Sequence, residues 1–305
     1  MIGSWSTWSR TSRTSFTSDP PGRGAIGIAT GLLRLVHPFP SFLNALITLG
    51  LARLAGAGWD RATLLALAMF TLQASIGSLN DLVDVERDRG HKPGKPLPRQ
   101  LVSVALARTI FVACLVAGLL LSLAIGPAVV VVALAGLAAG YAYDLRLKAS
   151  AWSWLPFAVG IPLLPVYAWL GASGGIPAAF LVLIPLAVLA GAALALANEL
   201  ADDERDRGAA VETSVGALGR VRAWRVGAIL ETLVALIAGG SLIVAGASTI
   251  ALGVADGSIA LAMIGLALGR SARPATRERG WEAQAVGLGG LALAWIGGLA
   301  GRGLL

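Results

Sequence analysis

The sequence has little charge, a single cysteine and only two histidines. Asp, Glu, Lys and Arg make up 13% of its 305 residues, whereas soluble globular proteins carry about 25%. This deficit, with 56% apolar residues and a mean hydropathy of +0.76, excludes an ordinary soluble domain and indicates a membrane protein. Because Cys114 stands alone in an apolar run, a disulfide framework and a cysteine-ligated metal site are excluded as well.

The first 24 residues, MIGSWSTWSRTSRTSFTSDPPGRG, lack the apolar stretch that a signal peptide needs. They are rich in Ser, Thr and Arg, a composition that favours disorder. We therefore expect a disordered basic tail over residues 1–24 and one domain over residues 25–305. A transit peptide is the alternative interpretation of the tail.

Apolar stretches long enough to cross a bilayer, about 20 residues each, recur along the rest of the chain. We place nine of them, at residues 32–54, 62–84, 101–125, 127–145, 153–171, 177–200, 224–246, 248–269 and 282–301. They are too continuous for the alternating strands of a membrane barrel. The sequence thus predicts an all-α polytopic membrane protein, a bundle of nine transmembrane helices.

The basic residues are distributed unevenly among the expected connections. With the N-terminus in the cytoplasm, all of them except Arg53, Arg61 and Arg302 fall on the cytoplasmic side. This bias is typical of cytoplasmic loops in membrane proteins. It predicts a cytoplasmic N-terminus, a functional face on the cytoplasmic side and a C-terminus on the opposite side. The net charge of +7 then reflects topology in the lipid bilayer, and no nucleic-acid partner is expected.

Carboxylates gather at two of the expected cytoplasmic helix ends. Residues 79–90 read LNDLVDVERDRG and residues 197–208 read ANELADDERDRG, and the two segments agree at eight positions without a gap. Side chains four residues apart share a face of a helix. Asn80, Asp84 and Asp88 therefore form one line, with Asp81 beside it. In the second segment the corresponding residues are Asn198, Glu199, Asp202 and Asp206.

Carboxylates this close repel one another, and partial burial raises the cost. Divalent cations relieve the repulsion, and Mg²⁺ combines a few carboxylates with waters and phosphate oxygens. Two such clusters that face each other would bind a diphosphate carrying Mg²⁺ ions. The alternative is a solvated helix end that Arg87 and Arg205 neutralise.

Basic and aromatic residues near these clusters suit an anionic substrate. Lys92, Lys95 and Arg99 follow the first cluster in a Pro-rich loop, and the fourth apolar stretch ends in YAYDLRLK, which holds Tyr141, Tyr143, Arg146 and Lys148. Lys and Arg bind phosphate oxygens well. We expect substrate contacts from Lys148, Arg146, Lys95, Arg99 and the two tyrosines. The alternative for each basic residue is that it only contributes to the cytoplasmic charge bias and does not bind substrate.

The two acidic segments resemble the motifs of a known family. NDLVDVERD matches the N-D-x-x-D-x-x-x-D motif of the UbiA superfamily of intramembrane prenyltransferases, and NELADDERD resembles the second, D-x-x-x-D, motif. KPLPRQLVS, YDLRLK and GAAVETSVGALGR also look like that family. The resemblance implies a helical bundle around a central cavity open to lipid. It also implies Mg²⁺-dependent transfer of a prenyl group from a polyprenyl diphosphate to a hydrophobic, often aromatic, acceptor.

The resemblance also implies roles for single residues. Metal ligands would be Asn80, Asp84 and Asp88 for one Mg²⁺ and Asn198, Asp202 and Asp206 for the other, with Asp81 and Glu199 as accessory ligands. The four aspartates among the main ligands would be catalytic. Glu199 stands where many members have Asp, and His37 stands where many have Arg. We expect His37 or Asn44 to contact the acceptor.

Other interpretations remain. A UbiA-type terpene cyclase would use the same motifs without an acceptor, whereas a CDP-alcohol phosphotransferase would need one contiguous motif that is missing here. A divalent-cation transporter would place its polar groups near the bilayer midplane. Asp144 and the second-motif Asp203 are candidate general bases, although for Asp144 an ion pair with Lys148 at i+4 is favoured. Glu231 and Asp256 lie within apolar stretches, and a re-entrant segment at Asp256 is an alternative to a continuous helix.

Overall fold

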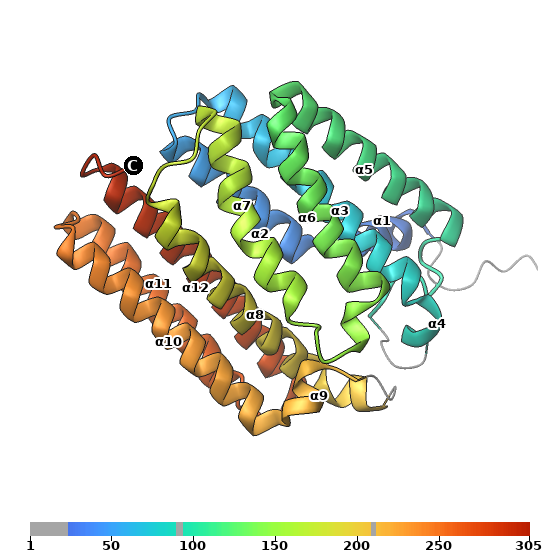
Figure 1. Cartoon of the computed structure of the whole chain (residues 1–305). Coiled ribbons are helices and arrows are strands. Elements are labelled where there is room, and N and C mark those ends of the chain that lie inside the picture. Colours follow the sequence, from blue (N-terminus) through green and yellow to red (C-terminus); the bar gives the residue numbers. More distant parts are fainter. Residues whose placement is uncertain (1–23, 90–93, 209–211) are drawn as a thin grey trace, which may run out of the picture.

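The computed structural model describes residues 24–89, 94–208 and 212–305, and this part of the chain is helical without strands (Figure 1). The residues of the expected tail lie outside the described ranges, except for Gly24. The elements are α1 (Ala25–Leu35), α2 (Pro38–Leu54), α3 (Trp59–Val83), α4 (Val85–Asp88), α5 (Val104–Ile125), α6 (Pro127–Leu145), η1 (Leu147–Ala149), α7 (Leu155–Ser173), α8 (Phe180–Gly208), α9 (Ser214–Leu218), α10 (Arg220–Val244), α11 (Thr249–Leu268) and α12 (Pro274–Ala300).

The all-α polytopic architecture is confirmed, and the number of spans depends on one bend. Among the described residues, eight helices are long and apolar enough to cross a membrane: α3, α5, α6, α7, α8, α10, α11 and α12. The pair α1 and α2 passes the same test only together, with a bend of 56° between its halves. The expected nine spans are therefore eight, or nine if the bent pair crosses the membrane once.

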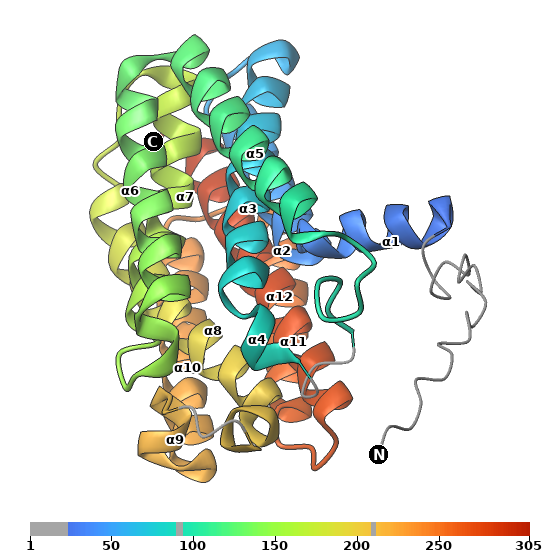
Figure 2. The same cartoon turned by 90° about the vertical axis from the view of Figure 1, so that its right-hand side faces the viewer.

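The bend corrects the expectation of one helix over residues 32–54. Pro38 begins α2, and a proline disfavours helical backbone at the residue before it. His37 lies outside the right-handed helical region, in a left-handed conformation with φ 48° and ψ 70°. Gly77 of α3 allows the ring to fit, because a Cβ there would lie 2.8 Å from Cγ of His37. The bend turns α1 away from the bundle axis (Figure 2).

Six helices surround the central cavity: α2, α3, α6, α7, α8 and α12. Outer helices such as α5 and α11 carry exposed apolar side chains, and Val244 at the end of α10 is 90% exposed. Such a surface would be unfavourable in water but suits lipid contact. Apolar residues therefore lie both around the central cavity and on the outer surface that faces the bilayer.

The polar connections between helices meet at one end of the bundle. Lys148, after α6, pairs with Asp84, after α3. Ser153 Oγ lies 2.8 Å from Ser214 Oγ, which joins the connections that follow α6 and α8. Figure 2 shows α4 and α9 at this same end. The two acidic segments are thus brought to one face, as their position along the chain predicts.

Several helices extend beyond their apolar stretches. Helix α8 continues to Gly208, so the second acidic segment is entirely helical, and α12 starts at Pro274 rather than near residue 282. Helix α11 is continuous over Thr249–Leu268, so the re-entrant alternative at Asp256 is wrong. The polar ends of α8 and α12 contact each other, since the Arg277 guanidinium of α12 pairs with Glu204 of α8.

Candidate functional site

The first acidic segment crosses a joint between two helices. Helix α3 ends at Val83, and Asp84 links it to the short α4. The backbone N–H of Asp84 donates to the Asn80 carbonyl at 3.0 Å, and that of Asp88 donates to the Asp84 carbonyl at 2.7 Å. The expected line of Asn80, Asp84 and Asp88 therefore continues across the joint. All three side chains are buried, as is Asp81.

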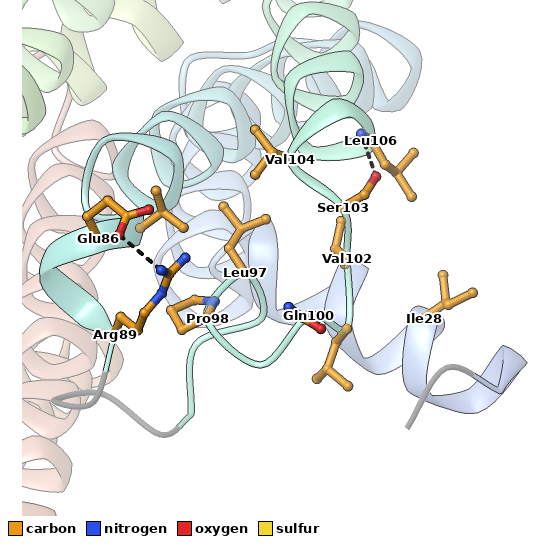
Figure 3. A pocket seen from close by; sticks show the side chains of 12 residues that line it. Ile28, Glu86, Arg89, Leu97, Pro98, Gln100, Val102, Ser103, Val104 and Leu106 are labelled. Carbon is orange, nitrogen blue, oxygen red and sulfur yellow. Dashed lines mark hydrogen bonds and ion pairs between the residues drawn. The ribbon is translucent and has the colours of Figure 1, made fainter. Parts of the chain in front are cut away.

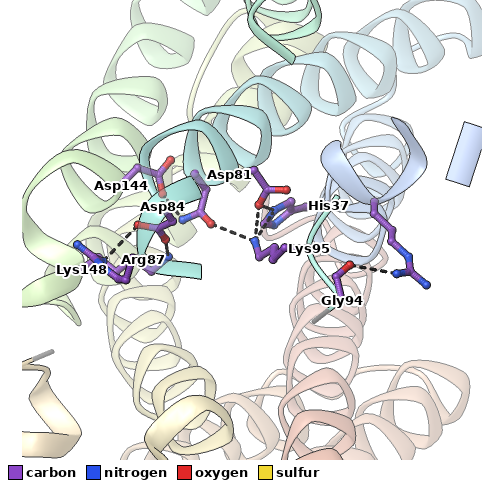
Figure 4. A network of polar contacts seen from close by, with 10 residues as sticks. His37, Asp81, Asp84, Arg87, Gly94, Lys95, Asp144 and Lys148 are labelled. Carbon is purple, nitrogen blue, oxygen red and sulfur yellow. Dashed lines mark hydrogen bonds and ion pairs between the residues drawn. The ribbon is translucent and has the colours of Figure 1, made fainter. Parts of the chain in front are cut away.

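Lys95 and His37 contact Asp81 on one side of α3 (Figure 4). Nε2 of His37 lies 2.9 Å from Oδ1 of Asp81, and the Lys95 ammonium pairs with the same oxygen. Lys95 Nζ also lies 3.3 Å from His37 Nε2. An ammonium group at this position offsets the cost of burying the Asp81 carboxylate.

Lys148 and Arg87 contact Asp84 on the other side of α3 (Figure 4). The Lys148 ammonium pairs with Oδ2 of Asp84, and Nη1 of Arg87 lies 3.2 Å from Oδ1. Lys148 also lies 5.9 Å from the ring centre of Tyr143. Each of these two motif aspartates is thus held by a lysine from a different connection, so two cationic groups border the same helix end.

Asp144 is bound differently from the favoured expectation. Oδ1 of Asp144 accepts a hydrogen bond from Nδ2 of Asn80 at 2.8 Å, whereas Lys148 pairs with Asp84. The i+4 ion pair required a continuous helix, but α6 ends at Leu145 and Arg146 has φ −143°. The contact instead orients the Asn80 amide and leaves its oxygen toward Lys95 at 3.4 Å.

Packing and one tether position Lys95. Nη1 of Arg34, on α1, donates to the carbonyl of Gly94 at 3.0 Å. Leu97 and Val102 of the same loop pack with Leu35 in a small buried cluster. The sequence gives no signal for this tether, because it joins residues 60 positions apart. Arg34 is one of the basic residues that the charge bias assigns to the cytoplasmic side, and in the structure it also holds the loop that carries Lys95.

The second acidic segment lies along α8. Oε2 of Glu199 accepts from the backbone N–H of Val215 at 2.9 Å, at the start of α9. Asn198 and Asp202 lie on the wall of the central cavity with Glu199. The side chain of Asp206 lies outside the described part of the structure, as does Lys92. Glu199 therefore connects the motif to α9.

The central cavity has a volume of about 570 Å³ and is polar at the end that holds the two motifs. Polar or charged residues on its wall include ten that we expected or considered: His37, Asn44, Asn80, Lys95, Tyr143, Asp144, Lys148, Asn198, Glu199 and Asp202. Deeper in the bundle the wall is apolar, with residues such as Met69, Leu72 and Leu164. The cavity therefore suits a ligand with a charged head and an apolar tail.

Some expected site residues do not line this cavity. Asp81, Asp84 and Asp88 are buried beside it, with the two lysines in contact with Asp81 and Asp84. Arg146 and Arg99 are exposed. Tyr141 bonds Ser75 Oγ at 3.0 Å and packs against Phe111 with ring centres 5.9 Å apart. Among the residues expected to contact substrate, Arg146, Arg99 and Tyr141 do not line the cavity, whereas Lys148, Lys95, Tyr143, His37 and Asn44 do.

Helix α12 supplies cavity residues that we did not expect, namely Glu278, Trp281 and Glu282. Trp281 packs edge-on against Phe39 of α2, with ring centres 5.4 Å apart. Gln73 of α3 also lines the cavity and was missed. A polar residue inside an apolar stretch was the available signal for Gln73. No pattern in the sequence indicated that α12 would pack against α2.

The donor atoms at the motifs fit a hard divalent cation. They are carboxylate and amide oxygens, which Mg²⁺ prefers. Oδ2 of Asp81 and Oδ2 of Asp144 are buried without a hydrogen-bond partner among the described residues. The described side chains nevertheless hold no cluster of three or more His, Cys, Asp or Glu arranged as metal ligands. The lysine ion pairs occupy part of the space around the carboxylates.

A second cavity, of about 950 Å³, lies between α1, α4 and the start of α5 (Figure 3). Its wall is mainly apolar, and its charged pair, Glu86 and Arg89, is exposed with an N–O distance of 3.2 Å. Asn80 and the residues of the second motif do not line it. The central cavity is therefore the better candidate site.

Solved structures of the same fold cover almost the whole chain. A UbiA homolog from Archaeoglobus fulgidus bound to GPP and Mg²⁺ is 21% identical, with a TM-score of 0.67 over 87% of this chain and 99% of that one. An apo UbiA homolog from Aeropyrum pernix K1 is 16% identical, with a TM-score of 0.65 over 85% and 96%. A digeranylgeranylglyceryl phosphate synthase is 17% identical, with a TM-score of 0.63 over 90% and 99%.

No curated protein matches the chain. The model of the UbiA prenyltransferase family matches residues 41–298, a range that includes both acidic segments and every helix from α3 to α11. This match agrees with the fold and with the resemblance of the motifs. The chain therefore belongs to the UbiA prenyltransferase family.

Proposed function

We propose that the protein transfers a prenyl group from a polyprenyl diphosphate to a hydrophobic acceptor in the central cavity, in a Mg²⁺-dependent reaction. The observation that carries this proposal is the polarity of the cavity. One end gathers the two acidic motifs with Lys95 and Lys148, and the remainder is apolar. A diphosphate with an isoprenoid tail has the same division between a charged head and an apolar chain.

The motif residues would hold the metal ions. Asn80, Asp84 and Asp88 would bind one Mg²⁺, and Asn198, Asp202 and Asp206 the other, with Asp81 and Glu199 as accessory groups. Bound Mg²⁺ supplies positive charge that stabilises the departing diphosphate. The solved Archaeoglobus fulgidus homologs bound to GPP or DMAPP with Mg²⁺ support a site of this fold that takes a prenyl diphosphate together with Mg²⁺.

Lys95 and Lys148 would bind the diphosphate oxygens. Both lysines already lie beside the motif carboxylates, so the site has positive groups in place where negative charge develops on the leaving group. The bond between C1 of the prenyl group and the diphosphate oxygen breaks, and its electron pair leaves with the oxygen. The apolar wall keeps water from the allylic cation, and the ring of Tyr143 offers a face that stabilises it.

The acceptor would approach from the side of His37 and Asn44, which line the cavity on α2 and its preceding bend. Its nucleophilic atom bonds to C1 of the cation and loses a proton. Oδ2 of Asp144 is a suitable proton acceptor, since it is buried on the cavity wall without a hydrogen-bond partner in the described residues. An aromatic or hydroxylic acceptor fits these roles.

Products formed by the purified protein test the proposal. The protein in lipid nanodiscs would be supplied with Mg²⁺, geranylgeranyl diphosphate and a panel of aromatic acids, quinone precursors, tetrapyrroles and glycerol-phosphate lipids. We expect a prenylated acceptor and stoichiometric release of diphosphate. A cyclic hydrocarbon formed without acceptor would indicate a cyclase. Divalent-cation flux in liposomes, without turnover of any prenyl diphosphate, would indicate a transporter.

Asp84→Asn and Asp202→Asn should each lower Mg²⁺-dependent turnover more than about 100-fold. Loss of a residue that only orients a metal ligand typically lowers activity about 10- to 100-fold, and loss of the ligand itself should cost more. Glu86→Gln is the matched control, since Glu86 lies near Asp84 but is exposed and paired with Arg89. It should retain turnover. Full activity in both aspartate variants would contradict the metal assignment.

A further inference from the structure

Two helical glycines on the cavity wall have open space beside them. Gly136 of α6 and Gly160 of α7 line the central cavity, and a Cβ built on either would meet no heavy atom within 4 Å. Two other wall glycines differ: a Cβ on Gly77 would lie 2.8 Å from His37, and one on Gly140 would lie 2.6 Å from Ile76. Close packing explains Gly77 and Gly140 but not Gly136 or Gly160.

Glycine in a helix interior costs about 0.5–1 kcal/mol relative to alanine. Neither Gly136 nor Gly160 has positive φ, so the backbone does not require glycine at these positions. Gly253 and Gly257 of α11 also have open space, but they face outward and line neither described cavity. What distinguishes Gly136 and Gly160 is that the missing side chains leave room inside the cavity.

Gly136 and Gly160 lie deeper in the cavity than its polar end. Val132, Gly136, Gly140 and Asp144 recur every fourth residue and share one face of α6. Gly136 lies about 12 Å along the helix from Asp144, at about 1.5 Å per residue. On α7, Gly160 follows Pro156, which begins the wall near the polar end. The two glycines therefore widen the cavity where a chain attached to a diphosphate would run.

A layer of larger side chains lies beyond the glycines. Val132, Leu164 and Tyr167 line the deep end of the cavity, and Tyr167 is 1% exposed. The Tyr167 hydroxyl lies 2.9 Å from Ser122 Oγ of α5, which fixes the ring in place. These three side chains add bulk to the wall formed by α6 and α7, beyond the two glycines.

The bundle is also held together past this layer. Arg61 Nε donates to the carbonyl of Gly171 at 2.5 Å, and Arg61 Nη2 donates to that of Ile125 at 3.2 Å. Leu65 fills the space beside Gly171, where a Cβ would lie 2.4 Å from it. A chain that extends past the glycines would therefore meet bulky side chains and, beyond them, a packed end of the bundle.

An independent feature indicates that the cavity takes a ligand. Asp144 lies on the same face of α6 as Gly136 and is 5% exposed. Its Oδ1 accepts from Asn80, but its Oδ2 has no hydrogen-bond partner among the described residues. A buried carboxylate oxygen is costly unless a partner satisfies it. The polar end of the cavity thus has a free acceptor, and the apolar part has free volume.

We infer that Gly136 and Gly160 accommodate the isoprenoid chain of the donor, and that the layer of Val132, Leu164 and Tyr167 limits the chain length that the cavity accepts. The inference rests on the proposed function and assigns the residues that determine donor length. Larger side chains at the glycines should shorten the preferred donor. Smaller side chains in the layer should lengthen it.

Binding of non-hydrolysable donors tests the inference without requiring transfer. The full-length protein with Mg²⁺ would be titrated with the thiolodiphosphate analogues of dimethylallyl, geranyl, farnesyl and geranylgeranyl diphosphate. For Gly136→Leu and Gly160→Leu, we expect affinity for the geranylgeranyl analogue to fall at least about tenfold relative to the dimethylallyl analogue, a typical effect of steric mismatch in an apolar pocket. Val132→Ala and Leu164→Ala should shift the preference toward longer analogues.

Gly253→Leu is the matched control, because it adds the same side chain at an open glycine outside the cavity. It should leave the four affinities and their order unchanged. If Gly136→Leu does not fold, Gly136→Ala and the two layer variants provide the same comparison. Wild-type binding that is independent of chain length, or equal weakening for all analogues, would overturn the inference alone. Wild-type protein that binds none of the analogues would overturn the proposed function as well.

Discussion

Lys95 and Lys148 are the side chains that link the acidic motif to the cavity. Each lysine lies on the cavity wall and pairs with a buried aspartate beside it. A buried carboxylate requires such a partner, and removal of one partner leaves an uncompensated charge. We expect the same two ammonium groups to bind an incoming diphosphate, since phosphate oxygens form charge-assisted hydrogen bonds with lysine.

Lys148→Met should weaken donor binding by about 10- to 100-fold, because a hydrogen bond to a charged group contributes about 1.5–3 kcal/mol. The affinity for a prenyl thiolodiphosphate in the presence of Mg²⁺ measures the effect. Arg146→Met is the matched control, since Arg146 is two residues away but exposed and absent from the cavity wall. Unchanged affinity in Lys148→Met would exclude a diphosphate contact for this lysine.

At the scale of single residues, the sequence indicated which residues lie near the cavity better than it indicated which side chains pair with one another. Repetition of the acidic segment identified Asn80 and Asn198, and both line the cavity. The partner of Asp144 was not predictable, because Asn80 lies 64 positions away and the choice depends on where α6 ends. Lys148 and Arg146 were equally suitable by sequence, but only Lys148 lines the cavity. The Lys148 side chain extends toward the bundle and pairs with Asp84.

Among the helices, proline had different effects in similar sequence contexts. Pro38 coincides with the bend between α1 and α2, whereas Pro162 and Pro165 lie inside α7 and Pro185 lies inside α8. A proline within a membrane helix is tolerated where neighbours satisfy the freed backbone groups. The bend at His37 is stabilised by a specific contact, since Ser41 Oγ donates to the Val36 carbonyl at 2.7 Å. Apolarity alone therefore predicted the helix over residues 32–54 but not its break.

Gly77→Ala tests how the bend is held against α3. The new Cβ would lie 2.8 Å from Cγ and 2.9 Å from Cβ of His37, so the ring or the helix must move. We expect a loss of about 1–3 kcal/mol in unfolding free energy, the usual cost of overpacking. The thermal unfolding midpoint in detergent should fall accordingly.

Two controls distinguish the loss of the Gly77–His37 packing from a general effect of alanine on the unfolding midpoint. Gly240→Ala adds a Cβ at an exposed helical position with open space, and it should not lower the midpoint. In a His37→Gly background, Gly77→Ala should cost much less, because the two changes concern the same contact. An equal cost with and without His37 would show that the bend does not depend on this packing.

For the whole molecule, the apolar stretches predicted the helical bundle, and the repeated motif predicted its family. Both are confirmed, because hydrocarbon thickness fixes the length of a span and the motifs are specific. The central cavity was implied by the resemblance alone. Its wall could not be predicted from composition, because it depends on which six helices face inward. The disordered tail over residues 1–24 stays a prediction.

The sidedness of the bundle can be measured because the chain has only one cysteine. In a Cys114→Ser background, Ala272→Cys would place a thiol at the end that holds the motifs, and Gly175→Cys would place one in the connection between α7 and α8. Both positions are exposed. Since the basic connections favour the cytoplasm, a membrane-impermeant maleimide added to intact cells should label only Gly175→Cys. Ala272→Cys should react after permeabilisation. Labelling of Ala272→Cys in intact cells would place the two lysines and the acidic motifs on the outer side.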